Sequence, residues 1–245
     1  MNSILVYHTI SSPAQALPGD IDISPERFER QLQWLSRWRK VVRLYQTLRA
    51  TDSRQVAITF DDGFRDNLTV ALPLLEKFNL PMTLFVTAGF VGAQGYLSRA
   101  ELREISKHPL VTIGAHGLKH RHFTRLSHAE ARFELIESRR MLEETTGNKV
   151  ELMAWPYGEC NYELELLCEE AGYRAAWSVW KGNNTRHSLW RVPLGRNDNL
   201  LRFIAKVSGA YFPVKALENK IAELKTSKKA ANMKPQRKEV STTTR

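Results

Sequence analysis

Two adjacent aspartates, Asp61 and Asp62, follow the apolar run VAITF and precede Gly63. An Asp-Gly pair at the end of a strand is ordinarily a turn. Two neighbouring carboxylates can also divide catalytic work, because one can bind a cation while the other accepts a proton. The cation offsets the repulsion between them, so both can stay ionised. The stretch is therefore a candidate both for a turn and for metal-assisted chemistry.

Two histidines, His116 and His120, frame the segment HGLKH. On a helical turn this i, i+4 spacing would point both rings the same way. Two imidazoles and one carboxylate make up the ligand set of catalytic zinc sites, which leave one position for water. Such spacing is common near turns, so the prediction of a metal site depends on where the histidines lie relative to the aspartates.

Apolar runs alternate with helical patterns along the chain. Helix starts are indicated by Ser24 before Pro25, and by Ser98 and Ser127, each with glutamate three residues later. Strands are expected near residues 3–7, 56–60, 82–87, 110–114, 151–155, 174–179 and 189–194, and helices lie between most of them. This order predicts parallel βαβ units. Periodicity alone does not choose between a doubly wound sheet and a closed barrel.

Polar residues follow several of these strands directly. His8 comes after SILVY, the aspartates after VAITF, His116 after LVTIG, and Tyr157 shortly after ELMAW. The carboxyl ends of parallel strands meet at one edge, where function gathers in such folds. We therefore expect these side chains to converge on one site.

These motifs together resemble the polysaccharide deacetylase family with its NodB homology domain, a group similar to carbohydrate esterase family 4. The resemblance is carried by TFDDG, by H-x-x-x-H about 55 residues later, by WPYG and by PMTLFVTAGFVG. It covers roughly residues 3–210. It implies an α/β fold of one domain (residues 1–224), a distorted (β/α) barrel of about seven parallel strands. The implied activity is that of a metal-dependent carbohydrate N-deacetylase.

The family pattern also implies a role for each matching residue. Asp61 would be the general base, and the loop around Tyr157 would supply a backbone N–H to the oxyanion. The implied metal ligands are Asp62, His116 and His120, and the implied substrate-binding residues are Trp155, Pro156, Tyr157 and Gly158. More broadly, the aromatic residues near the later strand ends either stack on sugar rings or belong to the core; they are Trp155, Tyr157, Trp177, Trp180 and Trp190.

The sequence departs from the usual pattern in three places. Gly117 stands where Ser or Thr usually follows the first histidine, and Ala154 stands where many members have an arginine that pairs with the base. A branch acting on exopolysaccharides resembles MAWPYG and supplies the arginine later, which makes Arg191 the candidate. The usual C-terminal motif with the acid histidine is not evident, and His187 does not match it.

The N-terminal run SILVYHTI resembles the Tyr-His opening of that same exopolysaccharide branch. By that resemblance His8 is the general acid. The alternative is a structural histidine hydrogen-bonded at a strand end, and in that case His187 is the next candidate for the acid.

The expected reaction is hydrolysis of the N-acetyl group of a sugar, with release of acetate. The substrate would be an oligosaccharide, or a lipid- or nucleotide-linked precursor in surface polysaccharide metabolism. Zinc suits two histidines and an aspartate, and nickel, cobalt or iron can occupy such sites. One alternative is a metal-dependent amidase or deformylase on another substrate. Another is an inactive protein that binds a glycan or polyanion, although the complete Asp-Asp-His-His set argues against lost catalysis.

Net charge and composition limit the expected partners and location of the protein. The net charge of +10 lies mostly in residues 225–245, a basic tail that we expect to be disordered. The tail is interpreted either as a solvated terminus or as an electrostatic contact with anionic lipid headgroups or another polyanion. Because the body is only mildly basic, nucleic acid is not an expected partner. The two cysteines form no disulfide framework and no signal peptide is evident, so we expect a cytoplasmic protein, with the oligomeric state open.

Overall fold

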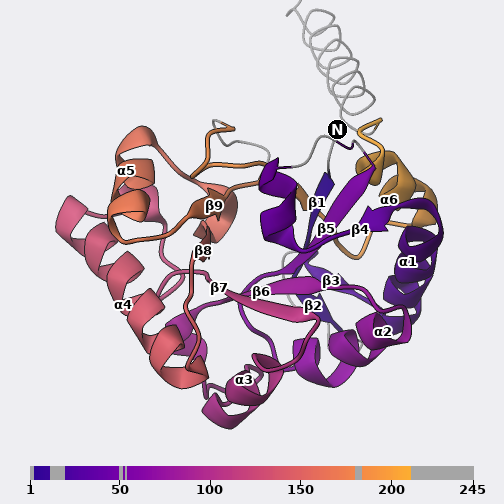
Figure 1. Ribbon diagram of the computed structural model, residues 1–245, viewed down its shortest axis with the longest axis horizontal. Helices are drawn as coiled ribbons and strands as arrows, with labels where there is room; N and C mark the ends of the chain where they lie inside the picture. The colour runs from indigo at the N-terminus through magenta and orange to yellow at the C-terminus, as the bar shows by residue number, and fades with distance from the viewer. Residues whose placement is uncertain (1–2, 12–19, 50–51, 53, 180–183, 211–245) are drawn as a thin grey trace, which may run out of the picture.

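The main sheet of parallel strands curls into a half-barrel, with helices around its outer face (Figure 1). The computed structural model describes residues 3–11, 20–49, 52, 54–179 and 184–210. The strand order is β10-β1-β5-β6-β7-β8-β9, and β4 pairs with β5 outside this path. This architecture confirms the predicted parallel barrel.

The strands form where the sequence is most apolar. β1 (Ser3–Tyr7) and β6 (Met82–Val86) are buried along their whole length, as expected for strands covered on both faces. The other strands of the sheet are β4 (Lys40–Val41), β5 (Gln55–Phe60), β7 (Val111–Ala115), β8 (Leu152–Ala154), β9 (Ala175–Trp177) and β10 (Val192–Pro193). A separate parallel pair comprises β2 (Thr9–Ile10) and β3 (Asp22–Ile23). The predicted strands are all present, and β8 to β10 are shorter than expected.

Helix ends follow the predicted capping signals. Ser24 caps α1, and Ser98 and Ser127 form complete capping boxes with Glu101 and Glu130. The helices are α1 (Pro25–Trp38), α2 (Leu72–Lys77), α3 (Arg99–Ile105), α4 (His128–Thr146), α5 (Tyr162–Glu170) and α6 (Leu200–Val207). In Figure 1, α1 to α5 follow one another around the outside of the sheet. Their buried faces form the main core against the outer surface of the strands.

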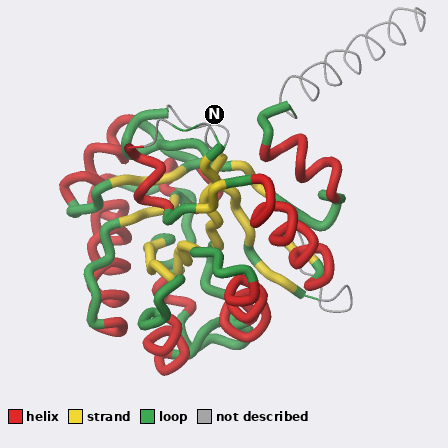
Figure 2. The backbone as a smooth tube through the Cα atoms, turned by 45° about the vertical axis from the view of Figure 1, so that its right-hand side comes forward, coloured by secondary structure: helices red, strands yellow, loops and turns green. Residues whose placement is uncertain are grey.

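One segment, residues 189–193, links the two edges of the half-barrel. Leu189 forms a parallel bridge with Trp177 in β9, and β10 pairs with β1. The inside of the curl holds a smaller apolar cluster, in which the rings of Phe85 and Trp177 lie 5.9 Å apart. The continuous backbone tube in Figure 2 shows the curl from a second side. These contacts fill the interior, so the barrel is packed and is not an open channel.

Two sequence expectations fall on residues outside this description. The basic tail at 225–245 and the aromatic candidate Trp180 both lie beyond the described ranges. Within those ranges, none of the helices combines the length and apolarity needed to cross a bilayer.

Candidate metal centre and active site

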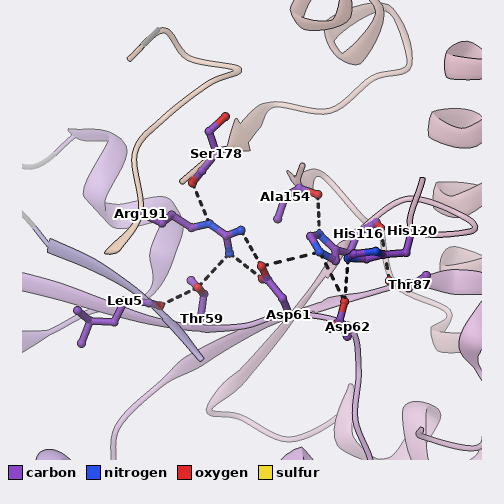
Figure 3. Close-up of polar contacts among 10 residues, drawn as sticks. All are labelled: Leu5, Thr59, Asp61, Asp62, Thr87, His116, His120, Ala154, Ser178 and Arg191. Atoms are coloured by element: carbon purple, nitrogen blue, oxygen red, sulfur yellow. Dashed lines mark hydrogen bonds and ion pairs between the residues drawn. The ribbon is translucent and has the colours of Figure 1, made fainter. Parts of the chain in front are cut away.

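The turn after β5 brings both aspartates to the same site. In a continuing strand, consecutive side chains would point to opposite faces of the sheet. Asp62 instead takes a left-handed conformation with φ of 74°, which aspartate tolerates better than most residues. As a result His116 Nε2 lies 3.8 Å from Asp61 Oδ2 and 3.6 Å from Asp62 Oδ1 (Figure 3). The Asp-Gly turn is therefore the feature that brings the paired carboxylates to one site.

Asp61 is buried in a two-pronged ion pair with Arg191. Arg191 Nη1 lies 2.7 Å from Asp61 Oδ1, and Arg191 Nη2 lies 2.8 Å from Asp61 Oδ2. The guanidinium is itself fixed by the hydroxyl of Thr59, by the carbonyl of Ser178 and by the ring of Phe85 beneath it. The structure therefore brings Arg191 to the carboxylate it was expected to orient. Its catalytic role stays a prediction.

Asp62 faces the two histidines on its other side. Its Oδ1 lies 3.3 Å from His120 Nε2, and it is a buried atom that finds no hydrogen-bond partner among the described residues. His116 Nδ1 is 2.7 Å from the Ala154 carbonyl, so this nitrogen donates and Nε2 is left with its lone pair toward Asp62. One ligand atom from each of Asp62, His116 and His120 lies within 4.8 Å of the others.

The segment HGLKH is a loop after β7, and is not the helical turn on which the i, i+4 spacing would align both rings. Gly117 and His120 both take left-handed conformations, with φ of 76° and 51°, so the chain reverses where a helix would continue. The carboxylate of Glu134 in α4 accepts hydrogen bonds from the backbone N–H groups of Leu118 (2.8 Å) and Lys119 (2.9 Å). The two imidazoles converge because of this buried carboxylate and the left-handed residues.

Glu134 is the site residue that the sequence reasoning missed. Its side chain is 2% exposed on the face of α4 that also buries Ala131 and Leu135. A charged residue on the apolar face of an amphipathic helix is unusual unless it is paired, and this was the available signal. The glutamate accepts hydrogen bonds from two loop N–H groups, one of which belongs to the buried residue Leu118.

His8 follows β1 and lies beside the aspartates. The backbone N–H of Asp61 donates to the carbonyl of Tyr7, which fixes the end of β1 against the end of β5. The side-chain amide of Asn67 holds the His8 carbonyl at 2.9 Å. His8 Nδ1 is buried and has no hydrogen-bond partner among the described residues. This nitrogen therefore makes no hydrogen bond of the kind that the structural alternative assumes, and the role of general acid stays a prediction.

The WPYG loop exposes one of its four predicted substrate-binding residues. Tyr157 is 52% exposed, whereas Trp155 is fully buried, and Pro156 and Gly158 are buried too. The Trp155 indole donates to the carbonyl of His187, so its ring packs in the core and offers no surface to a sugar. Tyr157 takes a left-handed φ of 60°, which turns its peptide out of the regular helical direction.

The aromatic ring of Tyr157 packs between two imidazoles. It stacks on His122 at 3.7 Å between ring centroids and meets His120 edge-on at 4.6 Å. Of the other aromatic candidates, Trp177 is fully buried and Trp190 is half exposed. His187, the second candidate for the acid, is buried with Nε2 3.1 Å from the Tyr173 carbonyl.

The two aspartates have opposite electrostatic properties. Burial alone would raise the pKa of Asp61, but the charge of Arg191, and then that of His116, holds this pKa well below its ordinary value. Burial raises the pKa of Asp62 to about 6, and the charge of Asp61 adds to the rise while His8 opposes it. Burial also lowers the pKa of His116 to about 3, and it lowers the pKa of His120 as well. At neutral pH the site presents two carboxylates and two neutral imidazoles.

The Asp62, His116 and His120 set fits a divalent cation. The unpartnered Asp62 Oδ1 is a buried acceptor, which is costly unless something positive binds it. His116 Nε2 is an acceptor as well, because Nδ1 of that neutral ring donates to Ala154, and a neutral His120 ring can present its Nε2 lone pair in the same way. A cluster of acceptors without a donor is the arrangement expected of metal ligands.

The family model described as polysaccharide deacetylase matches residues 48–176, and the chain belongs to this family. A relative in Bacillus subtilis named YxkH is 25% identical over 200 residues, covering 77% of this chain and 70% of the relative. The poly-beta-1,6-N-acetyl-D-glucosamine N-deacetylase of Staphylococcus aureus is 28% identical over 176 residues, covering 64% of this chain. This chain spans 61% of the length of that S. aureus enzyme.

Solved structures share the fold. The deacetylase PplD of Streptococcus pyogenes, solved in complex with acetate, matches with a TM-score of 0.75 and 22% identity, over 84% of this chain and 97% of that one. IcaB from Ammonifex degensii matches with a TM-score of 0.68 and 22% identity, over the same shares of the two chains. These likenesses show the NodB-like barrel of the family.

Proposed function

We propose that the protein is a divalent-metal-dependent N-deacetylase that removes acetyl groups from an N-acetylated glycan and releases acetate. The observation that carries the proposal is the convergence of two unlike carboxylates on two neutral imidazoles. Asp62 is unpartnered and faces His116 and His120, whereas Asp61 is fully engaged by Arg191. Membership of the polysaccharide deacetylase family supports this reaction class.

Asp62, His116 and His120 would hold the cation. Once bound there, it would supply Lewis-acid chemistry, polarising the acetyl carbonyl and making a water molecule more acidic. Zinc suits this donor set, and nickel, cobalt or iron are further candidates.

The remaining residues act on protons and charge. Asp61 stays ionised across the neutral range because Arg191 is bound to both of its oxygens, so it can accept the proton of the attacking water. The backbone N–H of Tyr157 would donate to the carbonyl oxygen as negative charge develops on it. His8 would give a proton to the leaving nitrogen. The C–N bond then breaks, leaving acetate and the free amine of the sugar.

The substrate class follows from the relatives. The S. aureus relative acts, by its name, on poly-β-1,6-N-acetyl-D-glucosamine. We therefore place an oligosaccharide of N-acetylated hexosamine first, ahead of lipid- and nucleotide-linked precursors. We also propose that the basic tail contacts a membrane surface and that the protein acts within the cytoplasm. The form of substrate that the protein accepts bears on both proposals.

The experiment is acetate release by purified protein from N-acetylated sugars, offered as free oligosaccharide, lipid-linked and nucleotide-linked forms. Release that a chelator abolishes, and that added Zn²⁺ restores, would support the proposal. Metal bound at about one equivalent with no acetate from any sugar would move the proposal to another amide or to a formyl group. Absence of bound metal would favour a glycan-binding protein without catalysis.

A further inference from the structure

A cavity of about 1270 Å³ opens at the end of the barrel away from the catalytic residues. Its lining includes Lys149 and Glu151 before β8, Arg174 before β9, and Ile4 near the start of β1. The catalytic candidates follow the carboxyl ends of these parallel strands, so the cavity lies at the amino ends. The packed rings of Phe85 and Trp177 fill the interior of the barrel. The cavity is therefore separate from the proposed deacetylase site.

Positive charge dominates the lining. The charged lining residues are Arg49, Lys149, Glu151, Arg174 and Arg186. The one carboxylate, Glu151, is paired with Arg174 at 3.3 Å. The side chains of Arg49 and Lys149 form no hydrogen bond or ion pair with another described residue. Cations gathered around one hollow create a local positive potential that attracts an anion.

The rest of the lining is apolar and aromatic. Ile4 in β1 and Leu152 in β8 line the wall, together with Leu189 from the segment that bridges to β9. Tyr45 and Trp190, which are 48% and 50% exposed, complete the lining. Ligand sites typically combine such apolar walls with a few charged groups that orient the ligand. An inorganic anion would leave the apolar wall unused, and a neutral lipid would leave the cations unused.

We propose that this cavity, at the amino ends of the strands, binds an organic anion that joins a phosphate head to an apolar chain. The head would pair with Arg49 and Lys149, whose side chains are not engaged by the described protein. The chain would lie along Ile4, Leu152 and Leu189. The same chemistry is offered by a free alkyl phosphate and by an anionic phospholipid in a membrane. Either ligand would leave the carboxyl end of the barrel open to a glycan.

The test is calorimetric titration of the full-length protein with octyl phosphate, and separately with octan-1-ol and with inorganic phosphate. We expect one equivalent of octyl phosphate to bind at least 10-fold more tightly than either of the other probes. Lys149→Glu and Arg49→Glu should each weaken octyl phosphate at least 10-fold. Lys107→Glu, the same charge change at an exposed position outside the cavity, should leave it unchanged. Thermal unfolding and circular dichroism show whether each variant is folded.

Vesicles of phosphatidylglycerol, compared with phosphatidylcholine, identify the source of the ligand. If Lys149→Glu weakens both octyl phosphate and phosphatidylglycerol vesicles, the site takes a membrane lipid; if it weakens octyl phosphate alone, the site takes a free anion. The basic tail is the same in wild type and variant, so its contribution cancels in this comparison. The proposal is overturned if octyl phosphate binds no better than octanol and phosphate, or if both cavity variants bind it like wild type. Neither result depends on deacetylase activity.

Discussion

Asp61 and Asp62 are adjacent in sequence, yet their carboxylates have opposite surroundings. Both oxygens of Asp61 are bound by Arg191, and the pKa of this carboxyl is held well below its ordinary value. Asp62 has a buried oxygen without a donor among the described residues, and burial raises its pKa to about 6. Two residues that are adjacent in sequence can therefore differ in partners and in pKa when one takes a left-handed conformation and a distant arginine pairs with the other.

The contrast indicates which carboxylate does which work. A bound cation stabilises a carboxylate only a little when a guanidinium already pairs with it. It stabilises an unpaired carboxylate that faces two imidazoles much more. We therefore assign the cation to Asp62 and the proton transfer to Asp61.

The largest effect is expected for Asp62→Ala. Removal of this ligand should lower cation binding and turnover together, the latter by about 10³-fold or more, because the Lewis-acid contribution is several kcal/mol. Metal content by elemental analysis and acetate release are measured on the same sample. Full activity with normal metal content would show that Asp62 is not a ligand.

A smaller loss is expected for His8→Ala. The cation should stay bound, and turnover should fall by roughly 10²-fold or more, as is typical when a general acid is removed. The rate is compared on substrates with better and worse leaving groups, since loss of an acid hurts the poor leaving group more. An unchanged rate would move the acid role to another residue.

Glu134→Gln tests the loop that carries the histidines. Both the Leu118 and Lys119 N–H groups donate to one carboxylate oxygen of Glu134, Oε2, and a neutral amide oxygen accepts such bonds more weakly than a charged one, so the loop should loosen. Cation affinity should fall by about 10- to 100-fold, the range for groups that orient metal ligands. Glu144→Gln, on the exposed side of the same helix, is the control and should bind like wild type. Equal cation affinities for the two variants would show that Glu134 does not support the metal site.

The smallest effect is a pH dependence of cation binding. Below about pH 6 the metal-free Asp62 is protonated, so a cation must displace that proton. The pKa of His116 is about 3, so its ring stays neutral and does not add to the effect in this range. Affinity should therefore fall by about tenfold per pH unit below pH 6. A competition assay with a zinc dye at pH 5, 6 and 7 measures it, and a flat profile would contradict the Asp62 assignment.

Local signals in the sequence predicted most of the fold. Ser98 with Glu101 and Ser127 with Glu130 start helices by contacts within one turn, and apolar runs such as VAITF form strands wherever both faces are covered. The convergence of the aspartates and histidines followed from one topological rule about strand ends.

Long-range contacts explain what the sequence did not predict. The HGLKH segment is a loop because Glu134, on another element, satisfies its N–H groups, and no pattern within five residues reveals that partner. Trp155 was expected at the substrate, but the same alternation that places a residue after β8 can point it into the core. Arg191 could be suggested only by resemblance, since 130 residues separate it from Asp61.

The most direct test of the divided site is Asp61→Asn. We expect metal content equal to wild type, with turnover lowered by roughly 10²- to 10⁴-fold. Because the change leaves the buried Arg191 facing a neutral group, circular dichroism at the assay temperature must show that the variant is folded. Metal content and acetate release are then measured on one preparation. Full turnover, or loss of the metal from a folded variant, would contradict the assignment of the proton to Asp61 and the cation to Asp62.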